Sequence, residues 1–156
     1  MSAPAELVVP PDTRYVGLAR LVVCAAARQA GLDDERTEDL RIAVSEATAN
    51  AILAHQRTGS GEPVRLCFGV VGGGAFQVTV ADTGPGFEPD DAAVVEGRDW
   101  TVEGGLGVTL IRGLADDVEF VQGAGMQVHL RFTVTLNGRE TAGREKAGTG
   151  GSPTTR

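Results

Sequence analysis

A long helix in the first half of the chain most restricts how this protein can fold. Asp33 or Asp34 can cap its start, and the helix is predicted to run to about Arg57. Its second half reads EATANAILAHQ, a stretch of small apolar residues that also carries Glu46 and Asn50. Because residues four apart return to the same helix face, these two polar side chains project together. The helix is therefore expected to pack with one face and to offer polar groups on another.

Strand and helix signals follow one another along the rest of the chain. Val16, Leu18, Leu21, Val22 and Ala25 have mostly helical spacing in the segment before Gly31, which stops that helix. The expected strands cover 6–10, 63–71, 75–82, 118–122 and 126–136, and the expected helices cover 13–30, 34–57 and 104–117. This order predicts an α+β fold, a two-layer sandwich in which helices cover one face of a mixed or antiparallel sheet.

Length and composition bound the domain organisation. The 156 residues suggest one domain, which we place at 1–136. The remaining segment, 137–156, contains no apolar residue larger than alanine after Asn137, so it is predicted to be a disordered tail. The formal charge of −7 argues against direct nucleic-acid binding, which requires clustered Lys and Arg.

The sequence shows no targeting or membrane segment. The N-terminus lacks the basic and apolar regions of a signal peptide, and no apolar run approaches the length of a membrane span, so a cytoplasmic protein is expected. Cys24 and Cys67 both lie in apolar segments, and we expect buried, reduced thiols rather than a disulfide. A zinc site formed with His55 and His129 is the alternative, but no CxxC or HxxxH spacing supports one.

The first candidate motif is the pair Glu46 and Asn50. The neighbouring alanines are expected to leave space over the pair; they are Ala43, Ala47, Ala49 and Ala51. A carboxylate can deprotonate a hydroxyl, and an asparagine carbonyl is a hard oxygen ligand for Mg²⁺. The alternative is a solvated polar stripe without a function.

The second motif is ADTGPGFEP, residues 81–89. Asp82 ends a predicted strand, and Gly84 and Gly86 allow a ligand to approach the backbone closely. A carboxylate at this position can accept a hydrogen bond from an exocyclic amine such as adenine N6. An ordinary Asp-Thr-Gly-Pro-Gly turn is the alternative interpretation.

The third motif is EGGLGVTLIRGL, residues 103–114, in which glycines open a helix. Free N–H groups at a helix N-terminus bind anions, and Gly104, Gly105 and Gly107 would let the backbone wrap phosphate oxygens. The stretch is neither a Walker motif nor a dinucleotide-binding fingerprint, because no Gly-Lys-Ser/Thr follows it and no strand precedes it.

Together, the three motifs resemble the N, G1 and G2 boxes of the GHKL ATPase superfamily, over roughly residues 6–136. RIAVSEATANAI and GGLGVTLIRGLADDVEF are most similar to the corresponding boxes of the anti-sigma factor serine/threonine-protein kinases of bacterial stress and sporulation switches. The short chain and the short segment between the second and third motifs fit the same family. The resemblance implies a Bergerat ATP-binding fold.

The resemblance also implies site roles. Glu46 would be the general base for an attacking serine hydroxyl, Asn50 would hold Mg²⁺, and Asp82 would bind the adenine amine. Gly84 and Gly86 would shape the adenine pocket, and residues 87–103 would form a nucleotide lid. The phosphates of ATP would be wrapped by Gly105, Leu106, Gly107 and Val108, with Thr109 close by.

The partners implied by the family are a sigma factor, which is sequestered, and an STAS-type anti-anti-sigma factor, which is phosphorylated on serine. A homodimer is implied as well, and Arg20 matches a position that docks partners; a solvated arginine is the alternative. Competing functions are a sequestering module without kinase activity, and a plain ATPase or detached histidine-kinase domain.

The sequence departs from the family pattern in two places. The family's histidine four residues after the asparagine is Ala54 here, and His55, one position later, is expected to have a structural role at the helix end. Met126 stands where the family has a threonine near adenine, which weakens the case for nucleotide binding. In the expected lid, Arg98 could approach the γ-phosphate and Trp100 could pack the lid or anchor a partner.

Overall fold

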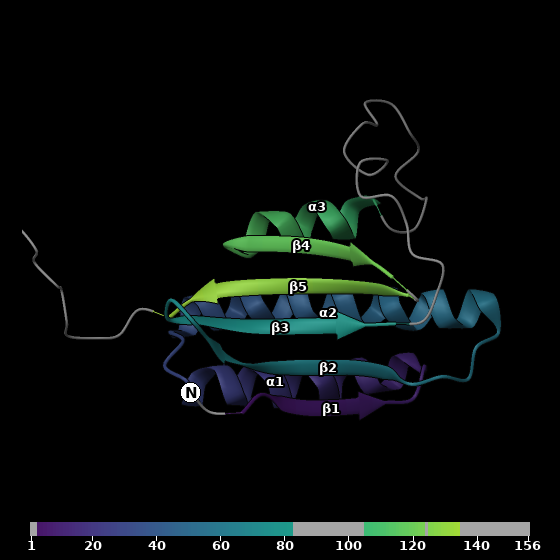
Figure 1. The fold of residues 1–156 in the computed structure, drawn as a ribbon, viewed down its shortest axis with the longest axis horizontal. Coiled ribbons are helices and arrows are strands. Elements are labelled where there is room, and N and C mark those ends of the chain that lie inside the picture. Colours follow the sequence, from purple (N-terminus) through teal and green to yellow (C-terminus); the bar gives the residue numbers. More distant parts are fainter. Residues whose placement is uncertain (1–2, 83–104, 124, 135–156) are drawn as a thin grey trace, which may run out of the picture.

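The computed structural model describes residues 3–82, 105–123 and 125–134 (Figure 1). Five antiparallel strands form one sheet in the order β1-β2-β3-β5-β4. The strands are β1 (Ala5–Val9), β2 (Val64–Val71), β3 (Ala75–Ala81), β4 (Asp117–Gln122) and β5 (Met126–Thr133). The helices are the 3-10 turn η1 (Thr13–Tyr15), α1 (Val16–Gln29), α2 (Asp34–Thr58) and α3 (Gly105–Leu114). The predicted α+β sandwich is confirmed, and the described sheet is antiparallel throughout.

The helices cover one face of this sheet. In Figure 1, α1 lies behind β1 and β2, and α2 lies behind β3 and β5. Residues alternate along the strands, so that Leu66, Val78 and Leu130 are fully buried against the helices. The opposite sheet face is polar and half-exposed, with Thr79 hydrogen-bonded to His129 across two strands.

The long helix α2 begins and ends where the sequence predicts. The Asp33 side chain accepts a hydrogen bond from the Arg36 N–H at 2.8 Å, which caps the first turn. At the other end, Gly59 adopts φ +66°, the left-handed conformation that terminates helices and that favours glycine.

The predicted apolar stripe of the first helix was wrong in part. The buried residues of α1 are Ala19, Val23, Cys24 and Ala27. Leu18 and Leu21 are exposed by 45% and 68%. Three of the four buried residues are small, and one of these, Cys24, contacts α2, with its Sγ 3.9 Å from the Thr37 carbonyl oxygen. The two leucines lie on the exposed side of α1.

Arg36 joins three elements next to the start of α2. Its guanidinium donates to Asp39 at 2.6 Å, to the Leu114 carbonyl at 3.0 Å and to Asp116 at 2.7 Å. The other Asp116 oxygen accepts from the Thr133 N–H at 2.6 Å. This network fixes the C-terminal end of α3, so it sets how α3 lies along α2.

We expect Arg36→Met to lower the free energy of unfolding by about 1–2 kcal/mol at pH 7, since hydrogen bonds to charged groups are lost at a partly exposed site. Partial burial opposes the charge of Asp116, but hydrogen bonds from Thr133 and Arg36 outweigh it and lower the pKa of this carboxyl. A lowered pKa stabilises the fold above the unfolded pKa of about 3.9, and that stabilisation is lost as the pH falls through the folded value.

Urea unfolding at pH 7 and at pH 3 measures both parts of this expectation. The destabilisation by Arg36→Met should shrink at pH 3. Arg14→Met is the control, because Arg14 is exposed and, among the described residues, forms an ion pair with Asp12 alone, within its own turn. The unfolding midpoint of this variant should not move. Equal midpoint shifts in the two variants would contradict the anchoring role of Arg36.

The two cysteines are free, as expected. Cys24 is buried, and burial raises the pKa of its thiol. Cys67 was predicted to be buried but is half-buried, because its side chain lies on the outer face of β2. No group of three or more His, Cys, Asp or Glu in the described ranges could hold a metal ion.

Two further predictions concern segments that the structure does not describe. The predicted tail 137–156 and the predicted lid 87–103 both lie outside the described residues. Within the described helices, none is long and apolar enough to cross a membrane.

Candidate functional site

Glu46 and Asn50 lie on the half-buried border of α2, between its buried face and solvent. Three of the four alanines that were expected to leave space over the pair are buried instead, and the fourth, Ala49, is half-buried. Ala43, Ala47 and Ala51 belong to the buried core, where their small side chains let α2 pack closely against its neighbours. A glycine on α3 approaches the polar pair closely instead.

That glycine is Gly107, in the first turn of α3. A Cβ atom at this position would lie 3.0 Å from the Glu46 Oε2 and 3.3 Å from the Asn50 Nδ2. The two predicted site residues of α2 therefore converge on one point of the third motif, although Asn50 and Gly107 are 57 positions apart in sequence. Only a residue without a side chain fits there without moving Glu46.

The start of α3 has the properties of an anion site. Gly105 and Leu106 lie in its first turn, where backbone N–H groups have no partner within the helix. Val108 is 2% exposed, so its side chain packs into the interior and only its backbone can contact a ligand. Thr109 has an exposed side chain on the same helix.

Asp82 lies directly after β3 and contacts the beginning of β5. Its N–H donates to the Met126 carbonyl at 2.9 Å, and its carboxylate accepts a long hydrogen bond of 3.5 Å from the Met126 N–H. The Met126 side chain is 3% exposed and is part of the core. At the position where the resemblance expects a threonine hydroxyl, the chain therefore has a buried thioether next to the candidate adenine-binding carboxylate.

His55 has the structural position that was expected. It is fully buried near the end of α2, and its Nδ1 lies 2.6 Å from the Glu62 carbonyl oxygen. The contact ties the end of α2 to the loop that leads into β2.

The remaining predicted site residues divide into two groups. Gly84, Gly86, Arg98, Trp100 and Gly104 lie outside the described residues. Arg20 lies on α1, in a groove between α1 and α2 that is separate from the Glu46, Asn50 and Gly107 contact. Arg36 was not predicted to be an anchor, because nothing in the sequence around it distinguishes Arg36 from a surface arginine.

Together, the sheet, the paired polar residues of α2 and the glycine-rich start of α3 define a class, the histidine kinase-like ATPases. The chain matches the histidine kinase-like ATPase domain family over residues 9–132. Among curated proteins, serine-protein kinase RsbW of Bacillus subtilis (strain 168) is 37% identical over 141 residues, covering 85% of this chain and 86% of the relative. RsbW of Bacillus velezensis is 36% identical with the same coverage of both chains.

A solved structure supports the same fold. The RsbU and RsbW domains of Rv1364c from Mycobacterium tuberculosis superpose with a TM-score of 0.65 at 16% identity, covering 88% of this chain and 34% of that one. The chain belongs to the histidine kinase-like ATPase superfamily, and within it to the family of the RsbW serine-protein kinases.

Proposed function

We propose that this protein is an ATP- and Mg²⁺-dependent serine kinase that also acts as an anti-sigma factor. The observation that carries the proposal is the convergence of Glu46 and Asn50 on the side-chain-free position of Gly107. Phosphoryl transfer depends mainly on positioning and charge neutralisation, and this contact brings a carboxylate, a carboxamide and a helix N-terminus together.

Each residue has a role in this proposal. Glu46 accepts the proton of the attacking serine hydroxyl, and Asn50 supplies an oxygen ligand to Mg²⁺. Backbone N–H groups of Gly105, Leu106, Gly107 and Val108 hold phosphate oxygens, with Thr109 beside them. Asp82, with Gly84 and Gly86, binds adenine. Mg²⁺ held by Asn50 would supply charge neutralisation at the phosphates.

The proposed site suits Mg²⁺ chemically. The ion prefers hard oxygen ligands and keeps several positions for water and phosphate, so it needs few protein side chains. One carboxamide next to a carboxylate and next to a phosphate-binding helix start satisfies that requirement. Glu46 and Asn50 are half-buried, so that a ligand can reach them.

The proposed partners follow from the family. The protein would sequester a sigma factor and phosphorylate a serine of an STAS-type anti-anti-sigma factor, in the cytoplasm and as a homodimer. Arg20, exposed on α1, is the proposed partner-docking residue. The relatives named serine-protein kinase RsbW support this assignment.

Calorimetric titration with ATP, with and without Mg²⁺, tests the nucleotide site. We expect micromolar binding that strengthens with Mg²⁺, and Asn50→Ala should remove most of the Mg²⁺-dependent gain, about tenfold in Kd or 1.4 kcal/mol. Gln56→Ala, an exposed carboxamide on the same helix, is the control and should bind ATP like the parent.

The second candidate function is a sequestering module without kinase activity. One observation favours it, the buried Met126 side chain beside Asp82. If millimolar ATP does not bind with or without Mg²⁺, the protein acts as a sequestering module and the kinase proposal fails. In that case the parent, Asn50→Ala and Gln56→Ala proteins would all give the same flat titration.

A further inference from the structure

α3 lies antiparallel to α2 along one side of the longer helix. Arg36, near the start of α2, donates to the carbonyl of Leu114 at the end of α3. Gly107, near the start of α3, lies against Asn50 in the second half of α2. The start of α3 therefore points along α2 towards its C-terminal end. Past Asn50, α2 continues through residues 51–58, which is about two turns.

Arg57 lies on the same side of α2 as this contact. With 3.6 residues per turn, it falls between Glu46 and Asn50 in angle, within about 20° of each. It follows Asn50 by seven residues, which is about 10 Å along the helix axis. The Cα–Cβ bond of a helical residue tilts towards the helix N-terminus, so a long side chain at this position can extend back towards Asn50. Arg57 is exposed, and Leu53 and Ala54, in the turn before it, are half-buried.

The adenine side of the proposed site lies at the same end of the molecule as Arg57. Figure 1 shows that α2 and β3 run in the same direction, so that the last residues of both elements lie at one end of the sheet. Asp82, the proposed adenine-binding residue, follows directly after β3. From the proposed site of phosphoryl transfer towards adenosine, α2 therefore presents Glu46, then Asn50 and then Arg57. The phosphate nearest to adenosine is the α-phosphate.

We infer that Arg57 binds the α-phosphate of ATP. Its guanidinium carries N–H donors in a fork that matches two phosphate oxygens, and it keeps its charge throughout the physiological pH range. Asn50 is neutral and Glu46 is an acid, so neither side chain supplies positive charge to a polyphosphate. This inference rests on the proposed function, and it adds a residue that would distinguish phosphorylated adenosine from adenosine itself.

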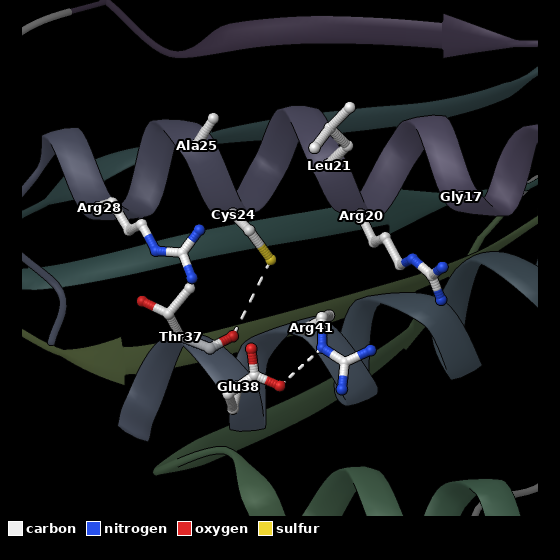
Figure 2. A pocket seen from close by; sticks show the side chains of 9 residues that line it. All are labelled: Gly17, Arg20, Leu21, Cys24, Ala25, Arg28, Thr37, Glu38 and Arg41. Atoms are coloured by element: carbon white, nitrogen blue, oxygen red, sulfur yellow. Dashed lines mark hydrogen bonds and ion pairs between the residues drawn. The ribbon is translucent and has the colours of Figure 1, made fainter. Parts of the chain in front are cut away.

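Arg41 is a matched arginine on the opposite side of α2. It precedes Asn50 by nine residues, which places it about 180° around the helix. Figure 2 shows Arg41 in the groove between α1 and α2, where it pairs with Glu38 at 2.8 Å. Both Arg41 and Arg57 are exposed, so replacing either by alanine removes one positive charge from the same helix. Arg41→Ala is therefore the control for net charge.

Displacement of a fluorescent ADP derivative from the full protein measures its affinity for ATP, ADP, AMP and adenosine. EDTA is present in these titrations, so that Mg²⁺ does not contribute to binding. We expect Arg57→Ala to weaken ATP, ADP and AMP by a similar factor of about tenfold, because all three carry the α-phosphate and each loses a charge-assisted hydrogen bond. The affinity for adenosine should not change.

Two further variants locate the effect. Arg57→Lys should bind the three phosphorylated ligands only about threefold more weakly than the parent, since lysine keeps the charge but not the forked geometry. Arg41→Ala should bind all four ligands like the parent. Both alanine variants should keep a cooperative urea transition, so that a loss of affinity is not a loss of folding.

The pattern across the four ligands separates this inference from the kinase proposal. A loss limited to the phosphorylated ligands, in Arg57→Ala but not in Arg41→Ala, supports the α-phosphate contact. Equal affinities in the parent and Arg57→Ala would overturn the contact and leave the kinase proposal intact. A loss that spares AMP, or an equal loss for adenosine, would also overturn it, because Arg57 would then act on another part of the nucleotide or through the fold. If the parent binds no nucleotide with or without Mg²⁺, the proposed function and this inference fail together.

Discussion

Glu46→Gln should leave ATP binding nearly intact and reduce phosphoryl transfer to a serine acceptor by about 10²–10⁴-fold, the range that general bases contribute. Glutamine has almost the same shape as glutamate, so the contact with Gly107 is kept, but the amide cannot accept the serine proton. The measurement is transfer of radiolabelled phosphate to a purified STAS-type protein, together with the Kd for ATP.

The control for this variant is Glu35→Gln, the same chemical change at an exposed position in the first turn of α2. Its transfer rate should match that of the parent, with at most a few tenths of a kcal/mol lost from the helix start. If Glu46→Gln transfers phosphate as fast as Glu35→Gln, then Glu46 is not the base. If it loses ATP binding as well, then Glu46 contributes to the nucleotide site itself.

Local chemistry explains why the fold could be predicted in such detail. Asp33 caps the start of α2, and Gly59 ends the helix in a left-handed conformation. Residues that cap or end a helix in these ways can be recognised in a sequence. The hairpin of β2 and β3 follows from alternating residues around Gly73 and Gly74, which have φ +83° and +72°. Signals of this kind need no knowledge of distant contacts.

Contacts between distant segments could not be predicted in the same way. Spacing places Glu46 and Asn50 on one face of α2, but the closeness of Gly107 depends on how α3 packs along α2. That packing depends in turn on Arg36 holding the Leu114 carbonyl and Asp116, a contact across 78 and 80 residues. The apolar stripe of α1 was predicted wrongly in part for the same reason, because the buried residues Ala19, Cys24 and Ala27 are less hydrophobic than the exposed Leu18 and Leu21.

Gly107→Ala should separate stability from function. Alanine favours helices over glycine by about 0.8–1 kcal/mol, so the variant should unfold at the same or a slightly higher urea concentration. The added Cβ would lie 3.0 Å from the Glu46 Oε2, which forces the carboxylate to move by a few tenths of an ångström and fills the space where phosphate would approach. We therefore expect ATP binding to weaken by about tenfold, or 1.4 kcal/mol. The rate of phosphoryl transfer should fall by a larger factor, because the displaced Glu46 carboxylate would no longer be aligned with the serine hydroxyl.

Gly113→Ala is the matched control on the same helix. A Cβ there meets nothing within 4 Å, so the same gain in helix propensity comes without a contact to Glu46 or Asn50. This variant should be slightly more stable than the parent, with ATP binding and transfer unchanged. If both alanine variants keep full activity, the approach of α3 to Glu46 and Asn50 is only a packing contact, and the nucleotide site lies elsewhere. If only Gly107→Ala loses activity while both proteins stay folded, the absence of a side chain at residue 107 is a requirement of the site and not of the fold.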